Sequence, residues 1–252
     1  MEEKREKEHF ILVYNNDLNS EYDNYLTPMD AFVYTTMKLM AGNPYGMDVL
    51  YATPDSICVY ALGEDCSKVP QRFVRDLRVS LKRIANNGYF PYVSDRRQVF
   101  DVSTFRKRDA MAKDGIEKFV MIPISSYKKI FQAFGLTETL KVKVFYFYLK
   151  LTRLIGFRTG VCTYSLDIIS EKTGVSKRTV QNYIKTLELY RVITVYHMGK
   201  NVNCYANYPT NVIGQYYNRE KVLQYGKDIY KEFCSKYRLD EDGNKKSQQA
   251  SA

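Results

Sequence analysis

Histidine is scarce in this sequence, and its scarcity argues against several kinds of active site. The 252 residues include two histidines, His9 and His197. No HxH or HExxH motif and no paired His/Cys cluster occurs, so we expect no zinc site and no histidine-based metal nuclease. The phosphate-binding patterns GxxxxGK[ST] and GxGxxG after a strand are also missing, which argues against an ATPase or a dinucleotide-binding enzyme. We therefore expect no cofactor, no metal and no enzymatic activity, although carboxylates distant in the sequence can converge in a fold.

Cysteines are few, odd in number and widely scattered. No CxxC pair exists, and most of the five lie in apolar runs: Cys58, Cys66, Cys162, Cys204 and Cys234. This usage is typical of small buried side chains in a reducing cytoplasm.

Long apolar runs are missing as well. No stretch approaches the roughly 20 apolar residues that cross a bilayer. The start, MEEKREKEHF, lacks the apolar core of a signal peptide, so we expect a cytoplasmic protein. What is abundant is positive charge: the formal net charge is +10 and the pI is about 9.2. Such a balance favours polyanionic partners.

The most informative stretch is 165–209, SLDIISEKTGVSKRTVQNYIKTLELYRVITVYHMGKNVNCYANYP. Ser165 is a candidate N-cap of a short helix that ends near Gly174, and Ser176 can cap a second helix. On that second helix Val180, Ile184 and Leu187 recur at i, i+4 and i+7, which predicts one buried stripe. Residues 192–196 and 202–205 flank a turn at 198–201, which predicts a β-hairpin with a basic tip.

This stretch resembles the winged helix-turn-helix of DNA-binding proteins, most closely in the string GVSKRTVQNYIKTLE and the following VI. Arg191 departs from the pattern, because many members place a glycine just before the hairpin. An arginine fits there if the backbone avoids positive φ or accepts strain. The alternative is a two-helix piece of an unrelated α+β core with a solvated polar face.

The spacing indicates an internal duplication. Leu77, Leu81 and Ile84 repeat the i, i+4, i+7 stripe, and a second predicted hairpin follows at 89–93 and 99–102. Earlier in each copy, the apolar run at residues 10–13 is similar in sequence to the run at residues 119–122. The first copy has a longer connection before its third helix.

We therefore predict a mainly helical α+β protein with two winged helix-turn-helix domains in tandem and a C-terminal helix. The expected segments are a charged tail (1–8), domain 1 (9–104), a linker or charged surface helix (105–118), domain 2 (119–212), a C-terminal helical segment (213–238) and a disordered tail (239–252). The C-terminal helix is amphipathic, and we expect it to pack on its own domain, with a dimer contact as the alternative.

The resemblance implies that the third helix of each copy enters the DNA major groove while the hairpin touches the backbone or minor groove. Arg178, Gln181 and Asn182 are the candidates for base reading. The full set of candidate DNA-binding residues is Ser176, Lys177, Arg178, Thr179, Gln181, Asn182, Lys185, Lys200 and Asn201 in the second copy, and Arg75, Arg78, Lys82, Arg96 and Arg97 in the first. The alternative for any one of these is a solvated surface side chain.

Tandem winged helices of this kind look like replication initiators of plasmids and phages of Gram-positive bacteria. That resemblance implies sequence-specific binding of double-stranded DNA at an origin and recruitment of host replication proteins. Two alternatives stay open: a transcriptional regulator or accessory DNA-binding protein of a mobile element, and a winged helix used for protein contacts.

Overall fold

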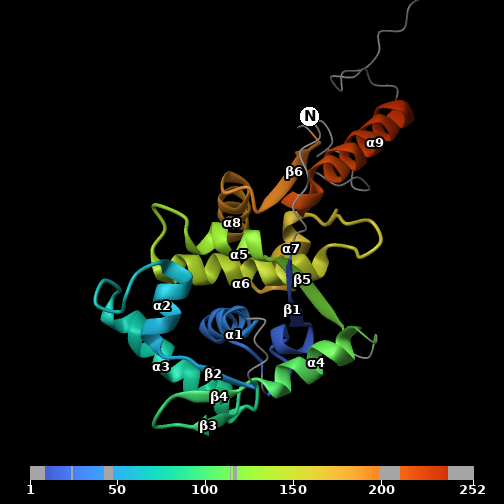
Figure 1. The fold of residues 1–252 in the computed structure, drawn as a ribbon. Helices are drawn as coiled ribbons and strands as arrows, with labels where there is room; N and C mark the ends of the chain where they lie inside the picture. Colours follow the sequence, from blue (N-terminus) through green and yellow to red (C-terminus); the bar gives the residue numbers. More distant parts are fainter. Residues whose placement is uncertain are drawn as a thin grey trace, which may run out of the picture. The chain divides into compact units, whose positions relative to one another are not determined.

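The computed structural model describes residues 9–23, 25–42, 48–113, 115, 118–198 and 211–237. The chain divides into two compact units, Met1–Arg153 and Leu154–Ala252 (Figure 1). The fold is α+β and mainly helical, with small sheets, as predicted. The predicted tails at 1–8 and 239–252 lie outside the described residues. Within the described part of the chain, no helix is long and apolar enough to cross a membrane.

Unit 1 begins with strand β1 and ends with a long helix. Its elements in chain order are β1 (Phe10–Tyr14), α1 (Pro28–Ala41), β2 (Val49–Tyr51), α2 (Pro54–Leu62), α3 (Gln71–Asn86), β3 (Tyr92–Ser94), β4 (Val99–Asp101), α4 (Ser103–Lys113), β5 (Phe119–Pro123), α5 (Ile124–Phe131) and α6 (Glu138–Leu154). Two helices start at a Thr-Pro pair: Thr27 and Thr53 form capping boxes, and the proline that follows each occupies the first turn of α1 and α2.

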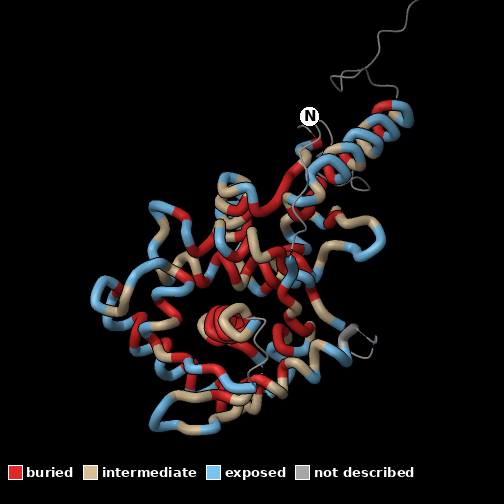
Figure 2. Tube along the Cα trace, in the orientation of Figure 1, coloured by how far each residue is buried: buried red, intermediate tan, exposed pale blue. Residues whose placement is uncertain are grey.

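Helix α1 supplies the centre of unit 1, and Figure 2 shows it almost wholly buried. Its Phe32 lies against Phe131 of α5, with ring centroids 4.6 Å apart. Phe131 in turn contacts Tyr127 and Phe145, so rings from α1, α5 and α6 form one aromatic cluster. Such tilted and edge-on ring pairs stabilise a core beyond their apolar area. The consequence is that α5 and α6 are part of unit 1.

Two sheets accompany these helices. β2, β4 and β3 form an antiparallel sheet in that order, so the hairpin β3–β4 is joined by the strand that precedes α2. β1 pairs with β5 in antiparallel register, with Leu12 opposite Met121. The two runs of similar sequence, 10–13 and 119–122, are therefore paired strands of one antiparallel ribbon.

The boundary between the units differs from the one that the sequence suggested. We expected a second domain from residue 119, but unit 1 extends to Arg153. The reason is physical: β5 completes its hydrogen bonds with β1, and the rings of α5 and α6 pack on α1. Long-range strand pairing of this kind leaves no local sequence signal.

The predicted linker at 105–118 is largely helix α4, which polar contacts fasten to unit 1. The Lys38 ammonium group of α1 lies 2.6 Å from the carboxylate of Asp109. Burial lowers the pKa of Lys38, while the neighbouring Asp109 raises it. Arg108 donates hydrogen bonds of 3.2 Å to both carboxylate oxygens of Asp17, and its guanidinium group lies over the ring of Tyr14. Two ion pairs, each with one buried partner, hold α4 against α1 and the segment that follows β1.

Unit 2 follows the same order on a smaller scale. It contains α7 (Leu166–Thr173), α8 (Lys177–Leu189), β6 (Ile193–His197), β7 (Asn211–Gln215) and α9 (Arg219–Tyr237). β6 pairs with β7, and Cys162 bridges to Ile213 of β7. The segment that precedes α7 thus joins the hairpin through Cys162, as β2 joins β4 in unit 1.

The partner of β6 is not the strand we expected. The predicted strand 202–205 lies outside the described residues, and β6 pairs instead with Asn211–Gln215. Part of that strand had been assigned to the C-terminal segment. Its placement follows from packing: Gly214 of β7 lies against Val222 of α9, and Gly226 of α9 lies against the ring of Tyr196 on β6. The prediction that the C-terminal helix packs on its own domain is confirmed.

The ends of α3 and α8 share one backbone motif. The N–H of Tyr89 donates to the carbonyl of Ile84, and that of Val192 donates to Leu187. The residues between these contacts, Gly88 and Arg191, both have positive φ, at 75° and 54°. Arg191 therefore occupies the left-handed conformation that Gly88 adopts at the end of α3, and it accepts the strain.

Candidate nucleic-acid interface

Helices α7 and α8 are joined by a tight turn with defined caps. The Ser165 hydroxyl accepts a hydrogen bond from the N–H of Ile168, which opens α7. Gly174 ends that helix at φ 68°, and the Ser176 hydroxyl accepts from the N–H of Thr179 to open α8. Ser170 donates to the carbonyl of Val175 at 2.6 Å and so fixes the turn. Side-chain caps satisfy backbone groups that helix ends leave open.

The predicted buried stripe of α8 is confirmed. Val180 and Leu187 are fully buried, and Ile184 is nearly so. Burial of these three side chains fixes the rotation of α8 about its axis, because every other exposure follows from the helical period. The face opposite the stripe is therefore held toward solvent by the core.

That outward face carries four of the residues predicted from the sequence. Arg178, Gln181, Asn182 and Lys185 are all exposed and stand at i, i+3, i+4 and i+7. They form one continuous stripe, which we call the α8 face. Guanidinium, carboxamide and ammonium groups of this kind hydrogen-bond to base edges and phosphates.

The predicted residues at the start of α8 already make contacts within the protein. The hydroxyls of Ser176 and Thr179 lie 2.9 Å apart and bond to each other, so both serve the cap. Lys177 is exposed and lies 2.8 Å from the carboxylate of Asp167 on α7. An exposed ion pair of this type is worth little in water, so the Lys177 ammonium group can exchange Asp167 for another anion.

The hairpin of unit 2 is described only at its base. The predicted contact residues Lys200 and Asn201 lie outside the described residues. At the end of β6, the Nδ1 atom of His197 lies 2.8 Å from the side-chain oxygen of Asn211, so this histidine bridges the two strands.

In unit 1 the predicted residues occupy α3 and the β3–β4 hairpin. Arg75, Arg78 and Lys82 are exposed on one side of α3, and Arg96 and Arg97 are exposed at the hairpin turn. All five side chains are therefore exposed on the helix and the hairpin where the sequence analysis expected them.

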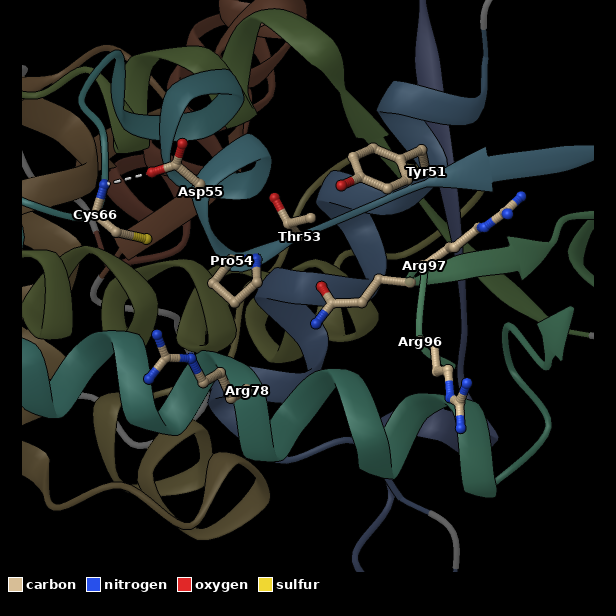
Figure 3. Close-up of a pocket in the computed structure, with 9 residues that line it drawn as sticks. Tyr51, Thr53, Pro54, Asp55, Cys66, Arg78, Arg96 and Arg97 are labelled. Atoms are coloured by element: carbon tan, nitrogen blue, oxygen red, sulfur yellow. Dashed lines mark hydrogen bonds between the residues drawn. The ribbon is translucent and has the colours of Figure 1, made fainter. Parts of the chain in front are cut away.

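A cleft of about 350 Å³ brings three of these arginines together with the start of α2. Its lining residues are Tyr51, Thr53, Pro54, Asp55, Cys66, Arg78, Arg96, Arg97 and Gln98. Figure 3 shows Arg78 on α3 and Arg96 and Arg97 on the hairpin, with guanidinium groups that point in different directions. The acidic lining residue, Asp55, accepts a 2.9 Å hydrogen bond from the backbone of Cys66. Spread-out cations of this kind match an extended polyanion better than one small anion.

Sequence reasoning did not foresee Tyr51 as part of this surface. Tyr51 is 62% exposed at the end of β2 and lines the cleft. An exposed aromatic side chain on a three-residue strand was the available signal. The other predicted arginine and lysine, Arg75 and Lys82, do not line the cleft.

Comparison with known proteins agrees with this geometry. A family model described as a helix-turn-helix domain matches residues 138–193. The match starts at the first residue of α6, includes α7 and α8, and ends at the first residue of β6. No curated protein and no solved structure gives a significant match. The chain thus contains a helix-turn-helix domain, and this domain supports binding to DNA.

No metal centre accompanies this surface in the described part of the chain, where no group of three or more His, Cys, Asp or Glu side chains could hold an ion. The described cysteines Cys58, Cys66, Cys162 and Cys234 are free thiols. Cys58 and Cys66 have their sulfur atoms 3.7 Å apart, and burial raises the pKa of both thiols.

Proposed function

We propose that this protein binds double-stranded DNA sequence-specifically, with α8 in the major groove and the β6–β7 hairpin near the neighbouring backbone or minor groove. The observation that carries the proposal is the α8 face: four exposed polar side chains in one stripe, within a segment that matches a helix-turn-helix model. In such domains the second helix of the motif lies in the major groove.

The side chains of the α8 face divide the work by chemistry. Arg178 suits the O6 and N7 atoms of guanine, and Gln181 and Asn182 each suit the N6 and N7 atoms of adenine, at about 1–3 kcal/mol of discrimination per good pair. Lys185 suits a phosphate, as does Lys177 once it leaves Asp167. Base contacts set the sequence, and phosphate contacts set position and affinity.

Unit 1 adds a second basic surface. Arg75 and Lys82 on α3, with Arg78, Arg96 and Arg97 around the cleft, supply five exposed cations. Each phosphate that a cation neutralises releases counterions, so binding becomes steeply dependent on salt. We propose that this second winged-helix module contacts the same DNA molecule.

The biological role that fits two such modules is initiation of replication of a plasmid or phage in the cytoplasm, without an enzymatic step of its own. In that role the protein recognises repeats at an origin and recruits host replication proteins, as a monomer or a homodimer. The support is the resemblance of the tandem arrangement to such initiators. Stimulation of origin-dependent replication separates this role from transcriptional regulation, which would change promoter activity instead.

The DNA-binding proposal is tested by selecting random duplexes on the full chain at two salt concentrations and sequencing what binds. We expect one enriched motif, affinity that falls with salt, and loss of preference at one position of the motif in Arg178→Ala. Lys231→Ala on α9 is the matched control, because Lys231 is exposed and its loss also removes one positive charge.

Two outcomes would overturn the proposal. One is no binding to any duplex. The other is equal binding to all duplexes, with Arg178→Ala and Lys231→Ala weakening it alike, since that pattern indicates charge attraction without sequence reading.

A further inference from the structure

Helices α3 and α8 can be aligned residue by residue. Their buried stripes lie 103 positions apart, with 77 matching 180, 81 matching 184, and 84 matching 187. The same offset relates Gly88 to Arg191, the two residues of positive φ that follow the helices. It also relates the hydrogen bonds that close the helices, from Tyr89 to Ile84 and from Val192 to Leu187. The alignment therefore rests on core packing and on backbone conformation.

Under this alignment the outward faces agree at both ends. Arg75 matches Arg178, and Lys82 matches Lys185; all four side chains are exposed. Identical charged groups at the two ends of the stripe suggest the same task in both copies, which is to hold the DNA backbone or an adjacent base.

The faces differ in the middle. Arg78 stands where α8 has Gln181, and Val79 stands where α8 has Asn182. Val79 is 51% exposed although its helix neighbours Arg75, Arg78 and Lys82 make this surface basic. The central pair is where a helix in the major groove meets base edges, so the two copies present different chemistry to the bases.

The two central pairs of side chains suit different bases. The two carboxamides of α8 can each pair with the N6 and N7 atoms of adenine. The guanidinium group of Arg78 pairs with the O6 and N7 atoms of guanine, and the methyl groups of Val79 suit the C5-methyl group of thymine. A carboxamide cannot replace an apolar contact without leaving polar groups unpaired.

We propose that α3 and α8 read different base sequences, α3 a guanine and an adjacent thymine through Arg78 and Val79, and α8 adenines through Gln181 and Asn182. The inference rests on the proposed DNA-binding function and specifies its target as two unlike half-sites. The site bound by one chain would thereby have two halves of different sequence.

Exchange of the central pairs tests the proposal. The full chain carrying Arg78→Gln with Val79→Asn, and the reciprocal chain carrying Gln181→Arg with Asn182→Val, are selected on random duplexes beside the wild type. The first variant should lose the guanine–thymine half-site and enrich adenines there, with roughly five- to 150-fold change in preference at each altered base. The second variant should change the other half-site in the opposite sense.

Two control variants distinguish a change in base recognition from the effects of lost charge and of poor folding. Lys231→Gln on α9 removes the same charge as Arg78→Gln and should leave the motif unchanged. Val79→Ala, which keeps Arg78 and favours helix, should relax the thymine position alone and so gives a second test if the double variant folds poorly.

The results distinguish this inference from the proposed function. If the wild type enriches no motif, the DNA-binding proposal itself fails. If the wild type enriches a motif but the α3 exchange leaves every base preference intact, or weakens all duplexes equally, α3 does not read bases and the inference is overturned while the function stands. Two identical half-sites in the wild-type motif would overturn it as well.

Discussion

Residue 191 offers a direct test of the strain at the end of α8. Arg191 has φ 54°, a conformation that costs an L-residue with a side chain about 1–2 kcal/mol and costs glycine little. Arg191→Gly removes the strain but also removes the whole side chain of a residue that has an interaction of its own. Arg191→Ala removes the same group and keeps Cβ, so the difference between the two variants isolates the backbone effect.

We expect Arg191→Gly to exceed Arg191→Ala in free energy of unfolding by about 1 kcal/mol. Gly88 provides the reverse experiment, because it has φ 75° and a Cβ added there would meet nothing within 4 Å. Gly88→Ala should therefore cost about 1 kcal/mol through backbone strain alone. Gly42→Ala, at φ −70°, is the matched control and should cost far less.

Urea denaturation followed by circular dichroism measures the free energies, and peptide-resolved hydrogen exchange assigns them to a unit. A difference of 1 kcal/mol appears as about a fivefold change in protection. The residue-191 variants should change protection in β6, and Gly88→Ala should change it in unit 1. Equal stability of the glycine and alanine variants at 191 would refute the assigned strain.

Three further predictions concern the cores and the ion pairs. Asp109→Asn should lower the free energy of unfolding by about 3 kcal/mol, because it leaves the buried Lys38 ammonium group without its partner; adding Lys38→Met should recover most of the loss in the same urea titration. Gly226→Ala should cost about 2 kcal/mol by thermal denaturation despite better helix propensity, since the new Cβ would lie 2.3 Å from the ring of Tyr196; an unchanged midpoint would contradict the packing of α9. Burial raises the pKa of Tyr127 above the ordinary 10.0, so its contribution to stability is complete below pH 10 and is lost as the pH rises toward the folded value; tyrosinate absorbance should show this group ionising only as the protein unfolds.

Local features of the helix-turn-helix were predictable from the sequence. Ser165 and Ser176 cap their helices as expected, and the Val180 stripe is buried. These signals act within a few residues, so spacing and residue type suffice to find them. The exposure of the α8 face followed directly, because one buried stripe fixes the opposite side of a helix.

Long-range pairings were not predictable in the same way. The sequence analysis named residues 202–205 as the partner of β6, whereas β6 pairs with Asn211–Gln215. Helix α9 packs on this pair, and its Gly226 admits the ring of Tyr196 on β6. Helix α4 has a polar sequence because the groups that hold it in place are charged. Asp109 pairs with Lys38 and Arg108 pairs with Asp17, and no local sequence pattern reveals pairs so far apart in the chain.

The register of β1 and β5 gives this two-stranded ribbon a local symmetry. By the parallel between 10–13 and 119–122, Leu12 corresponds to Met121, and these two residues face each other at the middle of the ribbon. Ile11 faces Ile122, which is the counterpart of Val13, and Val13 faces Val120, which is the counterpart of Ile11. A ribbon with a local dyad at its centre is one that two identical strands can share. Without β5, strand β1 would leave these hydrogen-bonding groups exposed as an open edge, and β5 covers that edge within the same polypeptide.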